Sequence, residues 1–269
     1  MGFGIETVAG ILTNAAATGA QAMTAASGQS FTVRAAATNT TPVNLVRVSG
    51  EFQDVGEIRI RSPRLHDDVN ALRLLSEQTH FGNVLQGPFM QPLYSQDTLI
   101  VEAFFEDIAT VNHISVAYLT IMYDDVPGIA GNYRSWAEVA PNVKNLLSVP
   151  NVLTSSATAG QWGATAAMNA TVDVFKANTL YALLGYVSLT AGGAFTIQGV
   201  DIGNLQVGGP LTDLADRTRD YFVKLSEQTG RPCIPIINSQ NKSTTNLQAS
   251  DLGASGEFEV STIWAELAA

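Results

Sequence analysis

The chain has 269 residues, of which 46% are hydrophobic and only 14% are charged, and its formal net charge is −10. Soluble monomers usually carry about a quarter charged residues, so this composition predicts extra buried surface, which self-association would supply. The excess of acidic residues argues against broad nucleic-acid binding, which needs a basic face. A single cysteine, Cys233, excludes an intrachain disulfide framework and a zinc site built from cysteines.

The start of the chain lacks the features of a signal peptide. Residues 1–30 have no basic start and no continuous apolar stretch, and Glu6 is their only charge. No later stretch reaches the roughly eighteen apolar residues of a membrane-spanning helix. We therefore expect a protein that is made and folded in the cytosol.

Residues 1–28 are rich in Ala, Gly and Thr. Their larger apolar residues would line one side of a short helix; these are Ile5, Val8, Ile11 and Leu12. We expect an N-terminal arm that either docks on a partner subunit or is frayed.

Residues 29–126 are expected to form a first β domain. Strands are predicted at 31–35, 45–52, 57–61, 89–94, 99–105 and 114–123. The last strand alternates apolar and polar residues closely enough to predict one buried face. Residues 66–68 offer an N-cap for a short helix with Leu72 and Leu75 on one face.

Residues 127–169 are expected to form a connector. Ser135 and Glu138 match a capping box. The apolar residues that follow at helical spacing are Val139, Val143, Leu146 and Leu147. Pro141 interrupts this predicted helix early.

Residues 170–269 are expected to form a second β domain. Strands are predicted at 171–175, 180–189, 194–200, 233–237, 245–249 and 258–266. A helix is predicted at 213–225, where one side is apolar and the other is charged. The glycine-rich stretch 203–210 is expected to be a turn.

A five-residue phrase, Leu-Ser-Glu-Gln-Thr, occurs at residues 75–79 and again at 225–229. Each copy is followed by a Pro, two large β-forming residues and Ser-Gln-Asp or Ser-Gln-Asn, at 92–97 and 235–241. We interpret the chain as one supersecondary unit used twice. The predicted fold is all-β, with two tandem antiparallel β-sandwiches or jelly rolls that arose by internal duplication and carry short inserted helices.

The sequence holds no recognisable catalytic or metal-binding motif. The histidines are His66, His80 and His113. They are not spaced as a ligand set, and His66 beside Asp67 and Asp68 is better explained as a helix start. No nucleophile elbow, Walker loop or calcium loop is present. We therefore predict no enzyme, no cofactor and no metal.

Five carboxylates near strand ends are the remaining candidates for an acid–base pair. They are Glu102, Glu106, Asp107, Asp124 and Asp125. A carbohydrate-cleaving enzyme would need two of them at a fixed separation across the substrate. Solvated carboxylates at strand ends are the more common finding.

Arg59, Arg61 and Arg64 form one positive stripe in an otherwise acidic chain. In a strand, Ile58 and Ile60 would point inward, and Arg59 and Arg61 would point outward. The stripe is the candidate interface or phosphate contact, facing a neighbouring subunit's carboxylates or the phosphates of lipid or nucleic acid. A solvated strand face is the simpler explanation.

Two tandem antiparallel β units in an acidic chain of low charge content resemble the double jelly-roll major capsid proteins of tailless icosahedral viruses, such as tectiviruses and corticoviruses. The resemblance covers about residues 30–126 and 170–267 and has its most specific support in the paired Leu-Ser-Glu-Gln-Thr phrases. A jelly roll has eight strands and we count about six per copy. Unassigned strands near Tyr133 or at 149–153 would supply part of the difference.

The resemblance implies a homotrimer of pseudo-hexagonal outline that tiles an icosahedral shell, with the N-terminal arm as a strap. It further implies residence in the virion after synthesis in the host cytoplasm. The implied partners are other copies of the chain, minor capsid or penton proteins and an internal membrane, without specific nucleic-acid binding. The alternative is a tandem β-sandwich that binds carbohydrate or mediates surface adhesion, with a sugar over Trp136 or Trp162. The third tryptophan, Trp264, lies in the last predicted strand. Tryptophans in such positions are more often packing residues than sugar-binding ones.

Overall fold

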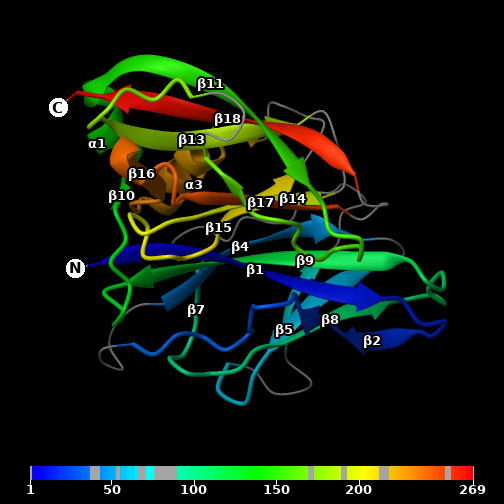
Figure 1. Ribbon diagram of the computed structural model, residues 1–269. Coiled ribbons are helices and arrows are strands. Elements are labelled where there is room, and N and C mark those ends of the chain that lie inside the picture. Colours follow the sequence, from blue (N-terminus) through cyan, green and yellow to red (C-terminus); the bar gives the residue numbers. More distant parts are fainter. Residues whose placement is uncertain are drawn as a thin grey trace.

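The structure is a computed structural model. It describes residues 2–36, 43–52, 55–65, 71–75, 90–168, 173–188, 193–211, 218–251 and 256–268. Four antiparallel sheets and a few short helices account for the regular structure, so the all-β prediction is confirmed. Figure 1 shows two sandwiches, one above the other, whose long strands run in roughly the same direction.

The first sandwich occupies the first half of the chain. Its strands are β1 (Phe3–Thr13), β2 (Gly19–Ala22), β3 (Thr24–Ala25), β4 (Val43–Glu51), β5 (Glu57–Arg61), β6 (Leu72–Leu75), β7 (Gln91–Pro92), β8 (Ile100–Phe105) and β9 (Ile114–Asp124). One sheet has the order β3-β1-β9-β4-β7 and the other has the order β2-β8-β5-β6. Without the short β3, the two sheets hold eight strands in the jelly-roll order, 1-8-3-6 and 2-7-4-5.

The second sandwich repeats this order. Its elements are β10 (Tyr133–Arg134), α1 (Trp136–Val139), β11 (Val143–Thr154), β12 (Ala166–Ala167), β13 (Leu180–Ser188), β14 (Gly193–Gln198), β15 (Val207–Leu211), α3 (Tyr221–Thr229), β16 (Ile234–Asn238), β17 (Asn246–Asp251) and β18 (Glu257–Leu267). The sheets run β10-β16-β13-β18-β11 and β12-β17-β14-β15. Without β10 they again read 1-8-3-6 and 2-7-4-5, so both units are jelly rolls of one topology.

The repeated phrase occupies the same place in both jelly rolls. The first copy begins at Leu75, the last residue of β6, and the second copy begins at Leu225 within α3, which follows β15. The first copy therefore begins at the end of the fifth strand, and the second lies between the fifth and sixth strands. The helix predicted to carry Leu72 and Leu75 is wrong, because these residues form β6, which pairs with β5. Residues 66–70 and 76–89 lie outside the described residues.

Most of the predicted N-terminal arm instead forms the three strands β1, β2 and β3. Residues 3–13 form β1, which pairs with β9 along its full length. The Ala- and Gly-rich composition that suggested an arm serves close packing, because both faces of β1 are covered. The other expected domain boundaries stay predictions.

The predicted connector also contains a strand. The capping box of Ser135 and Glu138 is present, but α1 ends at Val139 and Ala140–Asn142 form one 3-10 turn that includes Pro141. The apolar residues beyond it belong to β11, which pairs with β18. The predicted helix is therefore wrong after its first turn, and the strand expected at 149–153 is present.

The two cores are packed differently. The first jelly roll is filled mainly by aliphatic residues such as Leu45, Ile58, Val101 and Leu119. The second also contains aliphatic residues and adds a cluster of aromatic ones, which includes Phe175, Tyr181, Tyr186, Phe195, Tyr221, Phe222 and Trp264. Helix α3 contacts β13 and β16 and supplies two of these rings.

Candidate functional site: the junction between the jelly rolls

The two jelly rolls meet sheet on sheet. The outward face of β1 and β9 lies against β15 and against Ala194 of β14, and β4 also contacts β15. The hydroxyl groups of Tyr118 in β9 and Ser250 in β17 are hydrogen-bonded at 3.2 Å. The apolar residues that meet there are Ala9, Ile11, Ala26, Val116, Tyr118, Ala194 and Trp162. Every residue of β9 after Ile114 is buried, so the prediction of a strand with one buried face is wrong. The outward face is covered by the other half of the same chain.

Thr7 joins the two sheets by hydrogen bonds. Its Oγ1 donates to the carbonyl oxygen of Gly208 at 2.9 Å and accepts from the Gly208 amide at 3.1 Å. The Thr7 amide donates to the carbonyl oxygen of Gln206 at 2.7 Å. Gly208 lies in β15, so part of the stretch predicted to be a turn is a junction strand. A Cβ at Gly208 would clash with the backbone of Phe195 in the neighbouring strand β14.

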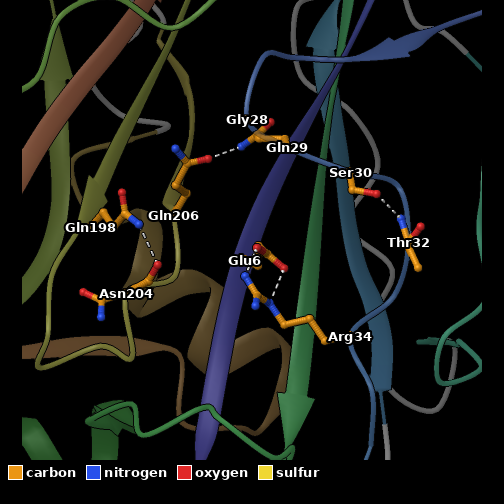
Figure 2. Close-up of a pocket in the computed structure, with 9 residues that line it drawn as sticks. All are labelled: Glu6, Gly28, Gln29, Ser30, Thr32, Arg34, Gln198, Asn204 and Gln206. Atoms are coloured by element: carbon orange, nitrogen blue, oxygen red, sulfur yellow. Dashed lines mark hydrogen bonds and ion pairs between the residues drawn. The ribbon is translucent and has the colours of Figure 1, made fainter.

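Gln29 completes the edge of β1 beside this contact. Its Oε1 accepts from the Ala9 amide at 2.7 Å, and its Nε2 donates to the Thr7 carbonyl at 2.9 Å. The side-chain amide thus occupies the position of a neighbouring strand. It also donates to Gln206 of the second jelly roll, as Figure 2 shows.

A polar cavity of about 330 Å³ opens at the rim of the junction. Its lining comes from both jelly rolls and consists of Glu6, Gly28, Gln29, Ser30, Thr32, Arg34, Gln198, Asn204 and Gln206. In Figure 2, Glu6 and Arg34 face each other, while Gln198 donates to the backbone carbonyl of Asn204 on the side of the second jelly roll. Arg34 donates two hydrogen bonds to Glu6, at 3.1 and 2.7 Å.

The carboxylate of Glu6 also links the cavity to the first core. The buried hydroxyl of Tyr123 donates to Glu6 at 3.0 Å. Burial, followed by the charge of Glu6, raises the pKa of Tyr123. The hydrogen bonds to Glu6 raise the pKa of Arg34. The lining is therefore amides, hydroxyls and one neutralised ion pair.

Charged groups lie at the other end of the junction. Arg231, which follows α3, is 3.1 Å from Asp124 at the end of β9. Asp124 is 8% exposed, and desolvation raises its pKa although Arg231 lowers it. The guanidinium of Arg47 lies 4.6 Å from the ring centroid of Tyr221, a cation–π contact between β4 and α3.

The predicted arginine stripe lies on the outward face of β5, away from the junction. Ile58 and Ile60 are buried, as expected for a strand with one buried face. Arg59 pairs with Glu57 and lies 3.5 Å from the ring centroid of Phe104. Arg61 donates to Glu102 at 3.1 and 3.0 Å. Arg59 and Arg61 are therefore each neutralised by a carboxylate of the same chain. Arg64 donates to the carbonyl of Ser95 at 3.4 Å.

The candidate carboxylates do not share one site. Glu102 pairs with Arg61 on the β5–β8 sheet, and Asp124 pairs with Arg231 at the junction. Glu106, Asp107 and Asp125 are exposed in loops. Within the described parts of the chain, no group of three or more His, Cys, Asp or Glu side chains is placed to hold a metal ion.

The tryptophans and the cysteine are packing residues. Trp264 is fully buried, and its Nε1 donates to Thr262 at 2.7 Å. Trp136 and Trp162 are half-buried, one against the second core and one in the junction. Cys233 is buried, which raises the pKa of its thiol to about 12.

No family model and no curated protein matches the chain. Among solved structures, the major capsid protein P2 from bacteriophage PM2 is similar over 99% of this chain and 98% of that chain, at 9% sequence identity and a TM-score of 0.25. A TM-score this low does not establish a shared fold, and the jelly-roll assignment rests on the strand order. In the parts of the chain that the structure describes, no helix is long and apolar enough to cross a bilayer.

Proposed function

We propose that the chain is a viral major capsid protein that assembles, as pseudo-hexameric trimers, into an icosahedral shell. The observation that carries the proposal is the pair of jelly rolls with one strand order, held side by side by a sheet-on-sheet junction. Three such chains supply six similar units, and six similar units approximate the sixfold symmetry that tiles a curved lattice.

The junction favours this function over a pair of independent modules. Its polar groups are bonded across the boundary, and both faces of β9 are buried. Two domains joined by such a contact behave as one block. A shell subunit needs this property, because the angle between its two halves sets the curvature of the lattice.

The proposal includes no catalysis. The protein would reside in the virion after synthesis in the host cytoplasm, where its partners are other copies of itself. Minor capsid or penton proteins and an internal membrane are further partners of the proposed shell. The low charged fraction of 14% supports extensive contacts between subunits.

The test is the mass of the purified protein, measured by light scattering behind a sizing column, with electron microscopy of any fraction in the void volume. We expect a trimer of about three times 28.5 kDa, or shells. A monomer at all concentrations would contradict the proposal.

The alternative function is carbohydrate binding. The polar cavity favours it, because planar amides and hydroxyls are suited to sugar hydroxyls and its one ion pair is already neutralised. Titration calorimetry with neutral oligosaccharides tests this alternative. Binding that is lost on Gln206→Ala, in a protein that stays monomeric, would replace the capsid proposal.

A further inference from the structure

The contact inside the chain uses one face of each jelly roll and leaves two corresponding faces open. The first jelly roll contributes the outward face of β1 and β9, and the second contributes the outward face of β14, β15 and β17. In the shared topology, β1 and β9 correspond to β11 and β18, and β14 and β15 correspond to β5 and β6. In the part of the chain that the structure describes, both corresponding faces carry exposed residues, such as Leu146 of β11 and Arg73 of β6.

The outward face of β11 and β18, here called the β11–β18 face, combines exposed apolar residues with an acidic end. Leu146 is 60% exposed and Val152 is 44% exposed, whereas the inward residues Val149 and Leu153 are buried. The outward residues beside them are Ser148, Pro150, Thr154, Ser261 and Ile263. The exposed Glu257 and Glu259 lie beside the C-terminal end of β11, opposite Thr154 and Val152 in the strand register, and Lys144 lies near its N-terminal end.

The outward face of β5, β6 and β8, here called the β5–β8 face, combines half-buried apolar residues with arginines. Phe104 and Ile100 lie in β8, and Ala20 of the neighbouring β2 pairs with Phe104. The charged residues of the face are Glu57, Arg59, Arg61, Arg73 and Glu102, with Arg64 in the turn after β5. Positive charge is in excess there, although the whole chain is acidic.

We propose that the β11–β18 face of one copy docks on the β5–β8 face of a second copy, repeating between molecules the sheet pairing that joins the two jelly rolls within one. The proposal rests on the proposed shell function and names the contact through which the subunits associate. A contact between two different faces is head-to-tail, so it closes into a ring when the rotation permits. With two jelly rolls per chain, a ring of three copies would use one sheet pairing six times.

Three observations favour a second copy as the occupant. The partner face already exists in the same topology within the chain, as β14 and β15 show at the junction. The acidic end with Glu257 and Glu259 is complementary to the arginine-rich β5–β8 face. An exposed apolar patch edged by polar residues is typical of a protein contact surface.

The two faces differ from the internal junction in a way that suits a reversible contact. The internal junction centres on Ala9, Ala194 and Gly208, which are small and uncharged. The open faces carry charged residues among larger apolar ones. Association through them is therefore expected to weaken with salt more than the internal junction, which is centred on uncharged residues and has the ion pair Arg231–Asp124 at one end.

Charge reversal tests the pairing. The first variant carries Glu257→Lys and Glu259→Lys, the second carries Arg64→Glu and Arg73→Glu, and the third carries all four changes. Arg64 is exposed and the Arg73 side chain is 50% exposed, so these changes leave the core intact. We expect the concentration for half-assembly to rise on the order of tenfold or more in each of the first two variants and to return toward the wild-type value in the third.

An apolar change tests the centre of the β11–β18 face. Leu146→Ser is expected to weaken assembly, and Ile108→Ser is the matched control. Ile108 is 71% exposed in the loop between β8 and β9, outside both faces. Light scattering over a concentration series measures assembly, and circular dichroism verifies that each variant is folded.

The outcomes separate this contact from the function on which it rests. If the wild type assembles and the charge variants assemble equally well, the contact is wrong and the shell function stands. If the first two variants are impaired and the fourfold variant is not restored, the pairing of these two faces is wrong. A wild type that is monomeric at every concentration overturns both proposals.

Discussion

The two jelly rolls share one strand order but place corresponding strands in different surroundings. Strand β9 is covered on both faces, whereas the corresponding β18 is covered on one face and leaves Glu257 and Glu259 exposed. On its junction face β9 carries the uncharged Val116, Tyr118 and Thr120, and its one charged residue, Asp124 at the strand end, pairs with Arg231. The composition of a strand in this molecule therefore depends on what covers its outward face, and topology alone does not determine it.

The interiors differ as well. Trp264 in β18 packs edge-on to Phe175 with ring centroids 5.5 Å apart. The corresponding β9 contributes Leu119 and Ile121 to an aliphatic core. Aromatic side chains bury more area per residue and hold fixed ring geometry. The second jelly roll, which α3 helps to fill, is therefore expected to be the more stable of the two.

Truncating one core residue in each jelly roll gives the largest expected effect. We expect Trp264→Ala to lower the free energy of unfolding by about 3–5 kcal/mol, because it removes a fully buried ring and leaves a cavity. Leu119→Ala in the first jelly roll is expected to cost about 2–5 kcal/mol. Denaturant unfolding followed by circular dichroism measures both.

The shape of these transitions tests the junction. If the two jelly rolls unfold as one block, each variant shifts a single transition. Two separate transitions, with only one of them moved by each variant, would show that the junction does not couple the halves.

Removing one hydroxyl group at the junction gives the next largest effect. Thr7→Val keeps the shape of the side chain but leaves the Gly208 amide and carbonyl without this partner. We expect a loss of about 1–3 kcal/mol in the free energy of unfolding, because Thr7 is fully buried. Thr24→Val is the control, since Thr24 is exposed and its Oγ1 bonds within the first jelly roll at 3.3 Å. An equal effect of the two changes would contradict the role of Thr7.

Five strands of the second jelly roll, β13, β14, β16, β17 and β18, could be predicted from the sequence, because turn residues bound them. The predicted helix at 213–225 overlaps α3 only at 221–225, and residues 213–217 lie outside the described residues. The strand predicted at 171–175 is wrong for its described part, since residues 173–175 are not in a strand.

The repeated phrase placed the duplication correctly, since Leu75 ends the fifth strand of one jelly roll and Leu225 lies between the fifth and sixth strands of the other. It did not predict local structure, because Leu75 ends a strand and Leu225 lies in a helix. Five residues carry too little information to determine a conformation that tertiary contacts decide.

The junction could not be predicted, because its signals resemble those of unstructured chain. Small residues such as Ala9 and Gly208 are typical of arms and turns, yet here both lie in strands that meet at the junction. Strand β11 was missed for a related reason. Leu146 and Leu147 are adjacent apolar residues after a true capping box, and one of them is outward and exposed.

The pH dependence of stability tests the charged end of the junction. Desolvation raises the pKa of Asp124 above its ordinary value of 3.8. The folded state therefore favours the protonated form, and this stabilisation is full below pH 3.8 and is lost as the pH rises through the raised pKa. We expect Asp124→Asn to be as stable as the wild type or roughly 0.5 kcal/mol more stable at neutral pH, because solvent screens the Arg231 pair.

A second carboxylate, Glu138, lies outside the junction, and its pKa is shifted in the opposite direction. Hydrogen bonds from Ser135 lower the pKa of Glu138 below 4.5. Its contribution is present above pH 4.5 and is lost as the pH falls through the lowered pKa. Unfolding measured between about pH 3 and 7 should therefore show opposite pH slopes for the stability differences of Asp124→Asn and Glu138→Gln. Equal slopes would contradict the assignment of Asp124 to a desolvated site.

The last prediction concerns the labelling of Cys233 by a thiol reagent. We expect no labelling of the native protein at pH 8. Cys233 is fully buried in the second jelly roll and its thiol pKa is raised to about 12, so neither access nor thiolate is available. Labelling then requires that the second jelly roll opens, and its rate reports on that half alone. Trp264→Ala should accelerate labelling strongly. Leu119→Ala should accelerate labelling only if the junction transmits the lost stability of the first jelly roll to the second. Equal acceleration by the two variants would indicate one cooperative block. No acceleration by Leu119→Ala would indicate two separate units.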